Sequence, residues 1–190
     1  LVNINPHYPG GLLNATYERI IRFKNHSELE ILNINHVGGF LYNLARRILK
    51  PYLTPKKELG KSKYRDLEYT NLDFKITAWI YVLKIINRKS FYNKHFNKIL
   101  GFFPSFSEFS GIYAHWGLPN TYIAYIINKN FDIPYFTVLH GSDINYVKFR
   151  DRKYLLNALS SADVNFFVSK NLFAKAISIG YKPSKPDQAK

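Results

Sequence analysis

Apolar and polar residues alternate along the chain in blocks whose spacing predicts an ordered series of strands and helices. Short blocks of branched and aromatic residues predict strands at 1–5, 29–34, 67–74, 111–115, 135–139 and 164–168. Apolar residues at helical spacing predict helices at 12–24, 40–49, 76–86, 91–100, 120–127, 155–159 and 171–179, with a turn at 116–119. Polar and proline-containing stretches predict a loop at 51–63 and a break between helices at 87–90.

This alternation of strands and helices predicts an α/β fold. Strands separated by helices pair in parallel, with the helices covering both faces of the sheet. We therefore expect a Rossmann-like, doubly wound parallel sheet with strand order 3-2-1-4-5-6. Gly180 is a natural residue to end the last helix, and the chain that follows it reads as a linker or frayed tail.

The composition is that of a folded protein rather than a disordered segment. The 190 residues are 46% hydrophobic and 17% aromatic, which is enough material for a packed core. Cys is absent, which excludes disulfides, Cys-ligated metals and thiol catalysis. Met is absent as well, so Leu1 indicates a processed or truncated start. The longest apolar run, 76–86, is shorter than the roughly 20 residues that cross a bilayer, and the amino end lacks signal-peptide character. We expect a cytoplasmic protein, soluble or peripheral at the inner face of a membrane.

The positive charge is concentrated in one part of the chain. The net charge is +14, and residues 40–100 carry fourteen Lys and Arg against four acids, or +10. Three interpretations are open: a solvated basic face produced by a Lys- and Asn-rich composition, an anionic membrane surface, or nucleic acid. Lys outnumbers Arg, and no nucleic-acid-binding motif is present, so we do not expect a nucleic-acid partner.

In a doubly wound sheet the ligand site lies beyond the carboxyl ends of the strands, where the strand order reverses. This edge falls between the first and fourth predicted strands. Four histidines are expected at carboxyl strand ends: His7, His36, His115 and His140.

Gly10 and Gly11 follow the first strand and open a helix. Their backbone can approach a ligand closely, with N–H groups facing an anion. The residues that follow do not complete a GxGxxG fingerprint, so a nicotinamide or flavin cofactor is not indicated, and a plain tight turn is the alternative.

The segment His140-Gly141-Ser142-Asp143 follows the fifth strand and is the more specific signal. Its imidazole can bind a sugar hydroxyl or stabilise developing charge. The alternative is a structural histidine, with Asp143 capping the next helix.

His115 and Trp116 offer an imidazole and an apolar platform for a sugar ring, or Trp116 only covers the end of the sheet. Ser169 is expected to cap the last helix. Neither an HxxxH metal motif nor a GxSxG elbow is present, so we expect no metal site and no serine hydrolase.

Four segments together resemble the family-4 retaining glycosyltransferases, which have the GT-B fold of two Rossmann-like domains facing a cleft. The resemblance is to the N-terminal, acceptor-side domain, spans 1–182, and is closest over 111–182. It is carried by Tyr113-Ala114-His115-Trp116-Gly117, by the run from Pro134 to Asp143, by Ala158 to Asp163, and by Phe167-Val168-Ser169-Lys170.

The resemblance implies transfer of a sugar from a nucleotide-sugar to a glycan or glycolipid acceptor, with retention of configuration and without an obligatory metal or cofactor. Surface polysaccharide synthesis is the usual setting. His140 matches the histidine that contacts the donor sugar near the reaction centre. Donor-binding positions match Gly10, Gly11, Gly141 and Ser142, and cleft or acceptor positions match His115, Trp116 and Asp143. Segment 40–100 matches a variable region that often faces the membrane.

The chain departs from this family in what it lacks. The family's C-terminal domain, with its nucleotide pocket and paired glutamates, is missing, and 183–190 reads as a linker or tail. We therefore expect half of an enzyme, inactive alone. The competing hypothesis is a stand-alone, non-catalytic basic module that binds a membrane surface or polyanion.

Overall fold

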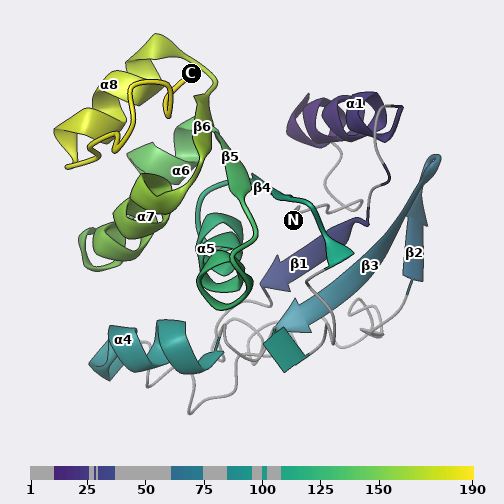
Figure 1. Cartoon of the computed structure of the whole chain (residues 1–190), viewed down its shortest axis with the longest axis horizontal. Helices are drawn as coiled ribbons and strands as arrows, with labels where there is room; N and C mark the ends of the chain where they lie inside the picture. The colour runs from purple at the N-terminus through teal and green to yellow at the C-terminus, as the bar shows by residue number, and fades with distance from the viewer. Residues whose placement is uncertain are drawn as a thin grey trace, which may run out of the picture. The chain divides into compact units, whose positions relative to one another are not determined.

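The computed structural model describes residues 11–25, 28, 30–36, 61–74, 85–95, 100–101 and 108–190. The chain forms two compact units, residues 2–86 and 87–190, and each is described by itself. Figure 1 shows the described elements coloured along the chain.

Where the structure describes the first unit, it shows helix α1 and a three-stranded sheet (Figure 1). Helix α1 spans Gly11–Lys24, and the strands are β1 (Leu32–His36), β2 (Lys61–Tyr64) and β3 (Leu67–Phe74). The strand order is β1-β3-β2, with β1 parallel and β2 antiparallel to β3. Ile20 of α1 is buried in one cluster with Ile31, Leu67 and Tyr69, so the apolar face of the helix does pack as its spacing predicts.

Strand β2 was not expected, because 51–63 was predicted to be a loop, and it makes the sheet mixed rather than wholly parallel. Its sequence, Lys-Ser-Lys-Tyr, is polar and short, as edge strands often are. A tight turn joins it to β3, and Arg65 occupies that turn with φ +52°. The Arg65 guanidinium lies 4.8 Å from the centroid of the Tyr17 ring, which ties the turn to α1.

The second unit is built on a parallel sheet of β4 (Ile112–His115), β5 (Tyr135–Leu139) and β6 (Val164–Phe167), in that order. Helix α5 packs on β4, β5 and α7, and α8 packs on β6 and α6. The remaining bounds are α4 (Arg88–Ser90), the π-helix η1 (Phe91–His95), α5 (Asn120–Phe131), α6 (Gly141–Asn145), α7 (Phe149–Ser161) and α8 (Lys170–Ser178).

The core of this unit forms where the helices cover the buried strands. Leu139, at the end of β5, is fully buried among apolar residues of α6, α7 and α8. Burial of such side chains is the main source of stability for a unit of this size. The cluster consists of Leu139, Ile144, Leu155, Leu159, Leu172, Ala176 and Tyr181.

The observed architecture is mixed α/β with parallel strands, as predicted at that level. The predicted strand order makes strands 2 and 3 neighbours, and these are β1 and β3, which pair in parallel. It also makes strands 4, 5 and 6 consecutive neighbours, and these are β4, β5 and β6, which pair in parallel as well. The described strands lie in two three-stranded sheets rather than one of six. The predicted strand 1–5, which would join them, lies outside the described residues, as does the predicted helix 40–49.

The helix predictions after residue 115 are confirmed in position and corrected in length, whereas the predicted helix 91–100 is a π-helix over Phe91–His95 and its residues 96–99 lie outside the described part of the chain. Helices α5 and α7 are longer than predicted, and the short α6 was missed because five residues hold too few apolar positions to show a period. Arg88–Ser90 is helical, so the predicted break at 87–90 is wrong except at Asn87, whose side chain caps α4 by accepting from the Ser90 N–H. Ser169 caps α8 as predicted, accepting from the Leu172 N–H at 3.2 Å.

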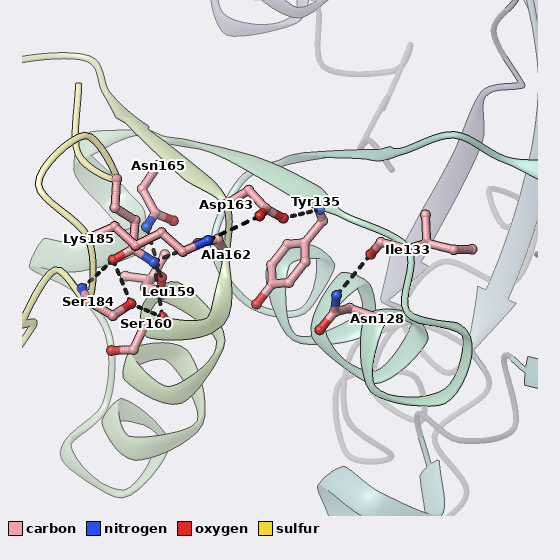
Figure 2. A network of polar contacts seen from close by, with 11 residues as sticks. Asn128, Ile133, Tyr135, Leu159, Ser160, Ala162, Asp163, Asn165, Ser184 and Lys185 are labelled. Carbon is pink, nitrogen blue, oxygen red and sulfur yellow. Dashed lines mark hydrogen bonds and ion pairs between the residues drawn. The ribbon is translucent and has the colours of Figure 1, made fainter.

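The carboxyl-terminal segment 183–190 is not frayed, so this prediction is wrong. Ala189 bridges Asn165 of β6 in parallel, and the Lys190 N–H donates to the Asn165 carbonyl at 2.9 Å. The buried Gln188 amide donates to the carbonyls that end α7: Leu159 at 3.1 Å, Ser160 at 3.0 Å and Ala162 at 2.6 Å. Figure 2 shows Ser184 and Lys185 of this segment beside Ser160 and Asp163. The segment therefore belongs to the second unit, and its docking satisfies carbonyls that would otherwise be left unpaired.

Within the described residues, no helix reaches the length and apolar content needed to cross a membrane.

Candidate functional site

The candidate site lies where β4 and β5 end side by side. The two strands are parallel, and His115 pairs in register with Val138, so His140 follows just beyond the paired region. The chain leaves β5 through His140, which is extended at φ −107° and ψ 170° and occupies the N-cap position of α6. The carboxyl ends of the two strands thus bring the two histidines to one edge of the sheet, as the strand-end argument predicts.

The two imidazole rings contact each other. Nε2 of His140 lies 3.1 Å from Nε2 of His115, and the ring centroids are 4.7 Å apart. At this distance one nitrogen carries the hydrogen and the other accepts it. His115 is fully buried, while His140 keeps 9% of its surface exposed. His140 is therefore the member of the pair that keeps some exposed surface.

Trp116 covers His140 from the adjoining loop. The Trp116 and His140 rings are 4.6 Å apart at an interplanar angle of 37°. Trp116 has φ +82°, a left-handed conformation that is unfavourable for a bulky residue. Two buried side chains hold this turn: Asn120 donates to the His115 carbonyl at 2.7 Å, and Thr121 donates to the Trp116 carbonyl at 2.8 Å. Among the described residues, the buried indole N–H of Trp116 has no acceptor.

Asp143 ties this loop to α6. Its carboxylate accepts a hydrogen bond from the His140 backbone N–H at 2.7 Å, and its carboxyl group also bonds the backbone of Gly117. Asp143 is thus the N3 residue that reaches back to the helix start, which confirms its predicted capping role. Burial raises the pKa of this carboxyl to about 6, although both backbone hydrogen bonds favour the charged form.

This pKa predicts how Asp143→Asn changes the pH dependence of stability. A carboxyl whose pKa rises from 3.8 to about 6 on folding favours the native state below pH 3.8, and this contribution is lost as pH rises through 6. The amide of Asn does not ionise, so the variant does not lose this contribution to stability as pH rises. The free energy of unfolding of the variant minus that of the native chain should rise by on the order of 2 kcal/mol between pH 4 and pH 7. Urea titrations at several pH values measure it, and a constant difference would contradict the raised pKa.

Gly117 is required by the close approach of this loop to α6. A Cβ at Gly117 would lie 3.0 Å from Cβ and 3.3 Å from Cγ of Asp143, so Asp143, which is tied to the start of α6, would have to move by a few tenths of an ångström. Gly117→Ala should therefore destabilise the second unit by about 1–3 kcal/mol. Gly141→Ala is the matched control, because the nearest atom to its Cβ is 3.6 Å away and Ala favours the helix. Equal loss from both variants in urea unfolding would refute this explanation.

The structure brings together six of the residues predicted to form the site. They lie within one loop and one helix start: His115, Trp116, His140, Gly141, Ser142 and Asp143. Ser142 is exposed and Gly141 is partly exposed at the first turn of α6. Gly11 begins α1 in the first unit, as the predicted helix opening requires, and Gly10 lies outside the described residues.

The sequence predicted the residues that form the site but not the residues that support it. Asn120 and Thr121 were read only as helix residues, although their position just after a strand-end turn is where side chains often bond a loop. Among the described residues no group of three metal-ligating side chains occurs. One shallow hollow lies elsewhere, in the first unit, lined by Lys24, Ile31, Asp66, Leu67 and Glu68, and it includes none of the predicted residues.

Chemically, the arrangement presents one imidazole that keeps some exposed surface on a rigid strand end, with an indole face beside it. Such a site can hydrogen-bond a hydroxyl group and pack against the apolar face of a sugar ring. A scan against protein-family models and a search of the curated proteins found no match for this chain.

Proposed function

We propose that this chain is the acceptor-side domain of a family-4 retaining glycosyltransferase, which transfers a sugar from a nucleotide-sugar to a glycan or glycolipid acceptor, in surface polysaccharide synthesis. The observation that carries the proposal is the placement of His140. It emerges from β5 beside the end of β4, contacts His115 and Trp116, and is held by Asp143. An imidazole that keeps some exposed surface at this edge is what the resemblance requires of the residue that touches the donor sugar.

In the proposed reaction, the bond between the anomeric carbon and the diphosphate oxygen breaks, and the nucleoside diphosphate leaves with the bonding electrons. The acceptor oxygen forms the new bond on the same face of the sugar and gives its proton to the departing diphosphate oxygen. His140 binds a hydroxyl of the donor sugar near the anomeric carbon, which holds the sugar in place and stabilises the transition state. Trp116 offers an apolar face at the same position, and Gly141 and Ser142 offer a backbone N–H and a hydroxyl for the donor.

The proposal also covers the strands that the structure shows as two separate three-stranded sheets. It assigns 1–182 to one doubly wound domain, whose first strand would join the two parallel sets. It assigns the glycine pair Gly10-Gly11 to the donor diphosphate. It places the nucleotide pocket in a second domain that these 190 residues do not contain. It uses neither a metal nor a cofactor other than the donor. The basic segment 40–100 would rest on an anionic membrane, where a lipid-linked acceptor is found.

The test uses the protein produced from the complete reading frame that contains these residues. It is incubated with UDP- and GDP-activated hexoses and a membrane extract as acceptor source. We expect one donor to release its nucleoside diphosphate and to give a product that keeps the anomeric configuration, read by NMR. An inverted product, or no release from any donor, would overturn the proposal. Transfer by residues 1–190 alone would overturn the division into two halves.

A further inference from the structure

The closest polar contact between the two strand ends is the one between His115 and His140. The two Nε2 atoms are 3.1 Å apart, and the ring planes are inclined by 67°. His115 is completely buried, so it does not line an open surface within the second unit. This complete burial indicates a role different from the acceptor contact that the resemblance suggests.

We propose that His115 is a positioning residue, which holds the ring of His140 through a single hydrogen shared between their Nε2 atoms and so couples the tautomers of the two histidines. The expected effect of His115 on turnover rests on the proposed function. The hydrogen bond between the two Nε2 atoms does not depend on that function.

The contact couples the two rings because each neutral imidazole carries one hydrogen. If Nε2 of His140 carries it, Nε2 of His115 must be bare, and the reverse also holds. The pair is therefore made of opposite tautomers. When His140 changes tautomer, His115 must change with it or the buried hydrogen bond is lost. An unpaired buried polar group costs about 1–3 kcal/mol, so either pairing of opposite tautomers is strongly favoured over a pair of like tautomers.

The surroundings make this arrangement rigid. Asn120 fixes the backbone carbonyl of His115 at 2.7 Å, so the strand end cannot turn away. The Trp116 ring lies 4.6 Å from the His140 ring and restricts its rotation. Asp143 holds the His140 backbone N–H at 2.7 Å. With both backbones held, the imidazole contact adds a direct constraint on the orientation of the His140 ring.

The direct test is long-range ¹H–¹⁵N NMR of the histidine side chains in the native 190-residue chain. We expect His115 and His140 to show opposite neutral tautomers, one protonated at Nε2 and the other at Nδ1. In His115→Leu, the ¹⁵N shift of His140 Nε2 should change, because that nitrogen loses its hydrogen bond to His115. In His115→Gln, whose amide can still bond Nε2, it should stay near the native value. Identical tautomers in the native chain, or unchanged His140 shifts in His115→Leu, would overturn the shared hydrogen.

The positioning role is tested in the complete protein. His115→Leu should lower kcat by on the order of ten- to hundredfold, with little change in KM for the donor, and His115→Gln should recover most of it. Full activity of His115→Leu overturns the positioning role even if the tautomers are opposite. If the native protein transfers no sugar, the proposed function fails while the NMR result stands by itself. The native-chain NMR needs no variant, so the shared hydrogen is tested even where His115→Leu does not fold.

Discussion

Asn165→Ala is expected to lower the free energy of unfolding of the second unit by about 3 kcal/mol. Asn165 is fully buried in β6, and its side chain bonds residues of β5 and α7 as well as Tyr181. Its amide nitrogen donates to the Leu159 carbonyl at 2.8 Å and contacts the Tyr181 hydroxyl at 2.9 Å. Its oxygen accepts from the Thr137 hydroxyl of β5 at 2.6 Å.

The cost is large because truncation leaves polar groups buried without their partner. The hydroxyls of Thr137 and Tyr181 lose a hydrogen bond in a region that water does not reach, since both residues are 0–1% exposed. Alanine also leaves a small void beside the helix cluster. The Leu159 carbonyl suffers less, because the Gln188 amide still donates to it.

Urea unfolding followed by Trp116 fluorescence measures this loss in the second unit. Trp79 belongs to the first unit, so the series is made in a Trp79→Phe background, in which Trp116 is the one remaining tryptophan. Asn157→Ala is the matched control, since Asn157 is exposed on α7 and should be neutral within about 0.5 kcal/mol. A loss below 1 kcal/mol for Asn165→Ala would contradict the central place given to this side chain.

The elements that the sequence predicted well are those whose own residues decide them. Strand β5 matches its predicted bounds because it is a short apolar run buried on the sheet, bounded by Pro134 and His140. Strand β3 matches as well, although half of its residues are polar, because its apolar residues alternate with polar ones. In these places the local pattern and the tertiary environment agree.

The elements that were missed depend on residues far away in the chain. Segment 183–190 has the composition of a linker, yet Gln188 is buried because the carbonyls at the end of α7 need donors. Strand β2 forms because β3 offers it a free edge, which its own polar sequence does not reveal. Long-range hydrogen bonding of this kind leaves no periodic signal in the segment that supplies it.

The candidate site was predictable in part for the same reason. The rule that ligand sites lie at carboxyl strand ends placed His115 and His140 at one edge. It did not distinguish the fully buried histidine from the one that keeps some exposed surface. His115 is the last residue of β4, whereas His140 is the first residue after β5, and this difference in position depends on where each strand ends. The need for glycine at Gly117 was also hidden, since it arises from the approach of Asp143.

The second large effect is expected at His140. His140→Ala removes the one imidazole of the pair that keeps surface exposure, and with it the proposed contact to the donor sugar. Loss of a group that binds the reacting centre in the transition state typically costs a factor on the order of 100 to 1000 in kcat. The fold should survive, because the Asp143 carboxylate bonds the backbone N–H of residue 140, which alanine keeps.

Two comparisons separate lost chemistry from lost structure in this variant. Urea unfolding should show the second unit of His140→Ala destabilised by no more than about 2 kcal/mol, and so still folded under assay conditions. Asn145→Ala is the matched control on α6, because Asn145 is exposed at the end of the same helix and has no proposed contact with the donor. It should keep the native kcat within about twofold.

The most direct measurement of the central claim is therefore sugar transfer by the complete protein and by its His140→Ala variant, with the donor that the native protein accepts. We predict a product that retains the anomeric configuration from the native protein, and a kcat that is lower by a factor on the order of 100 or more in the folded variant. Transfer at the native rate by His140→Ala, or no transfer from any nucleotide-sugar by the native protein, would contradict it.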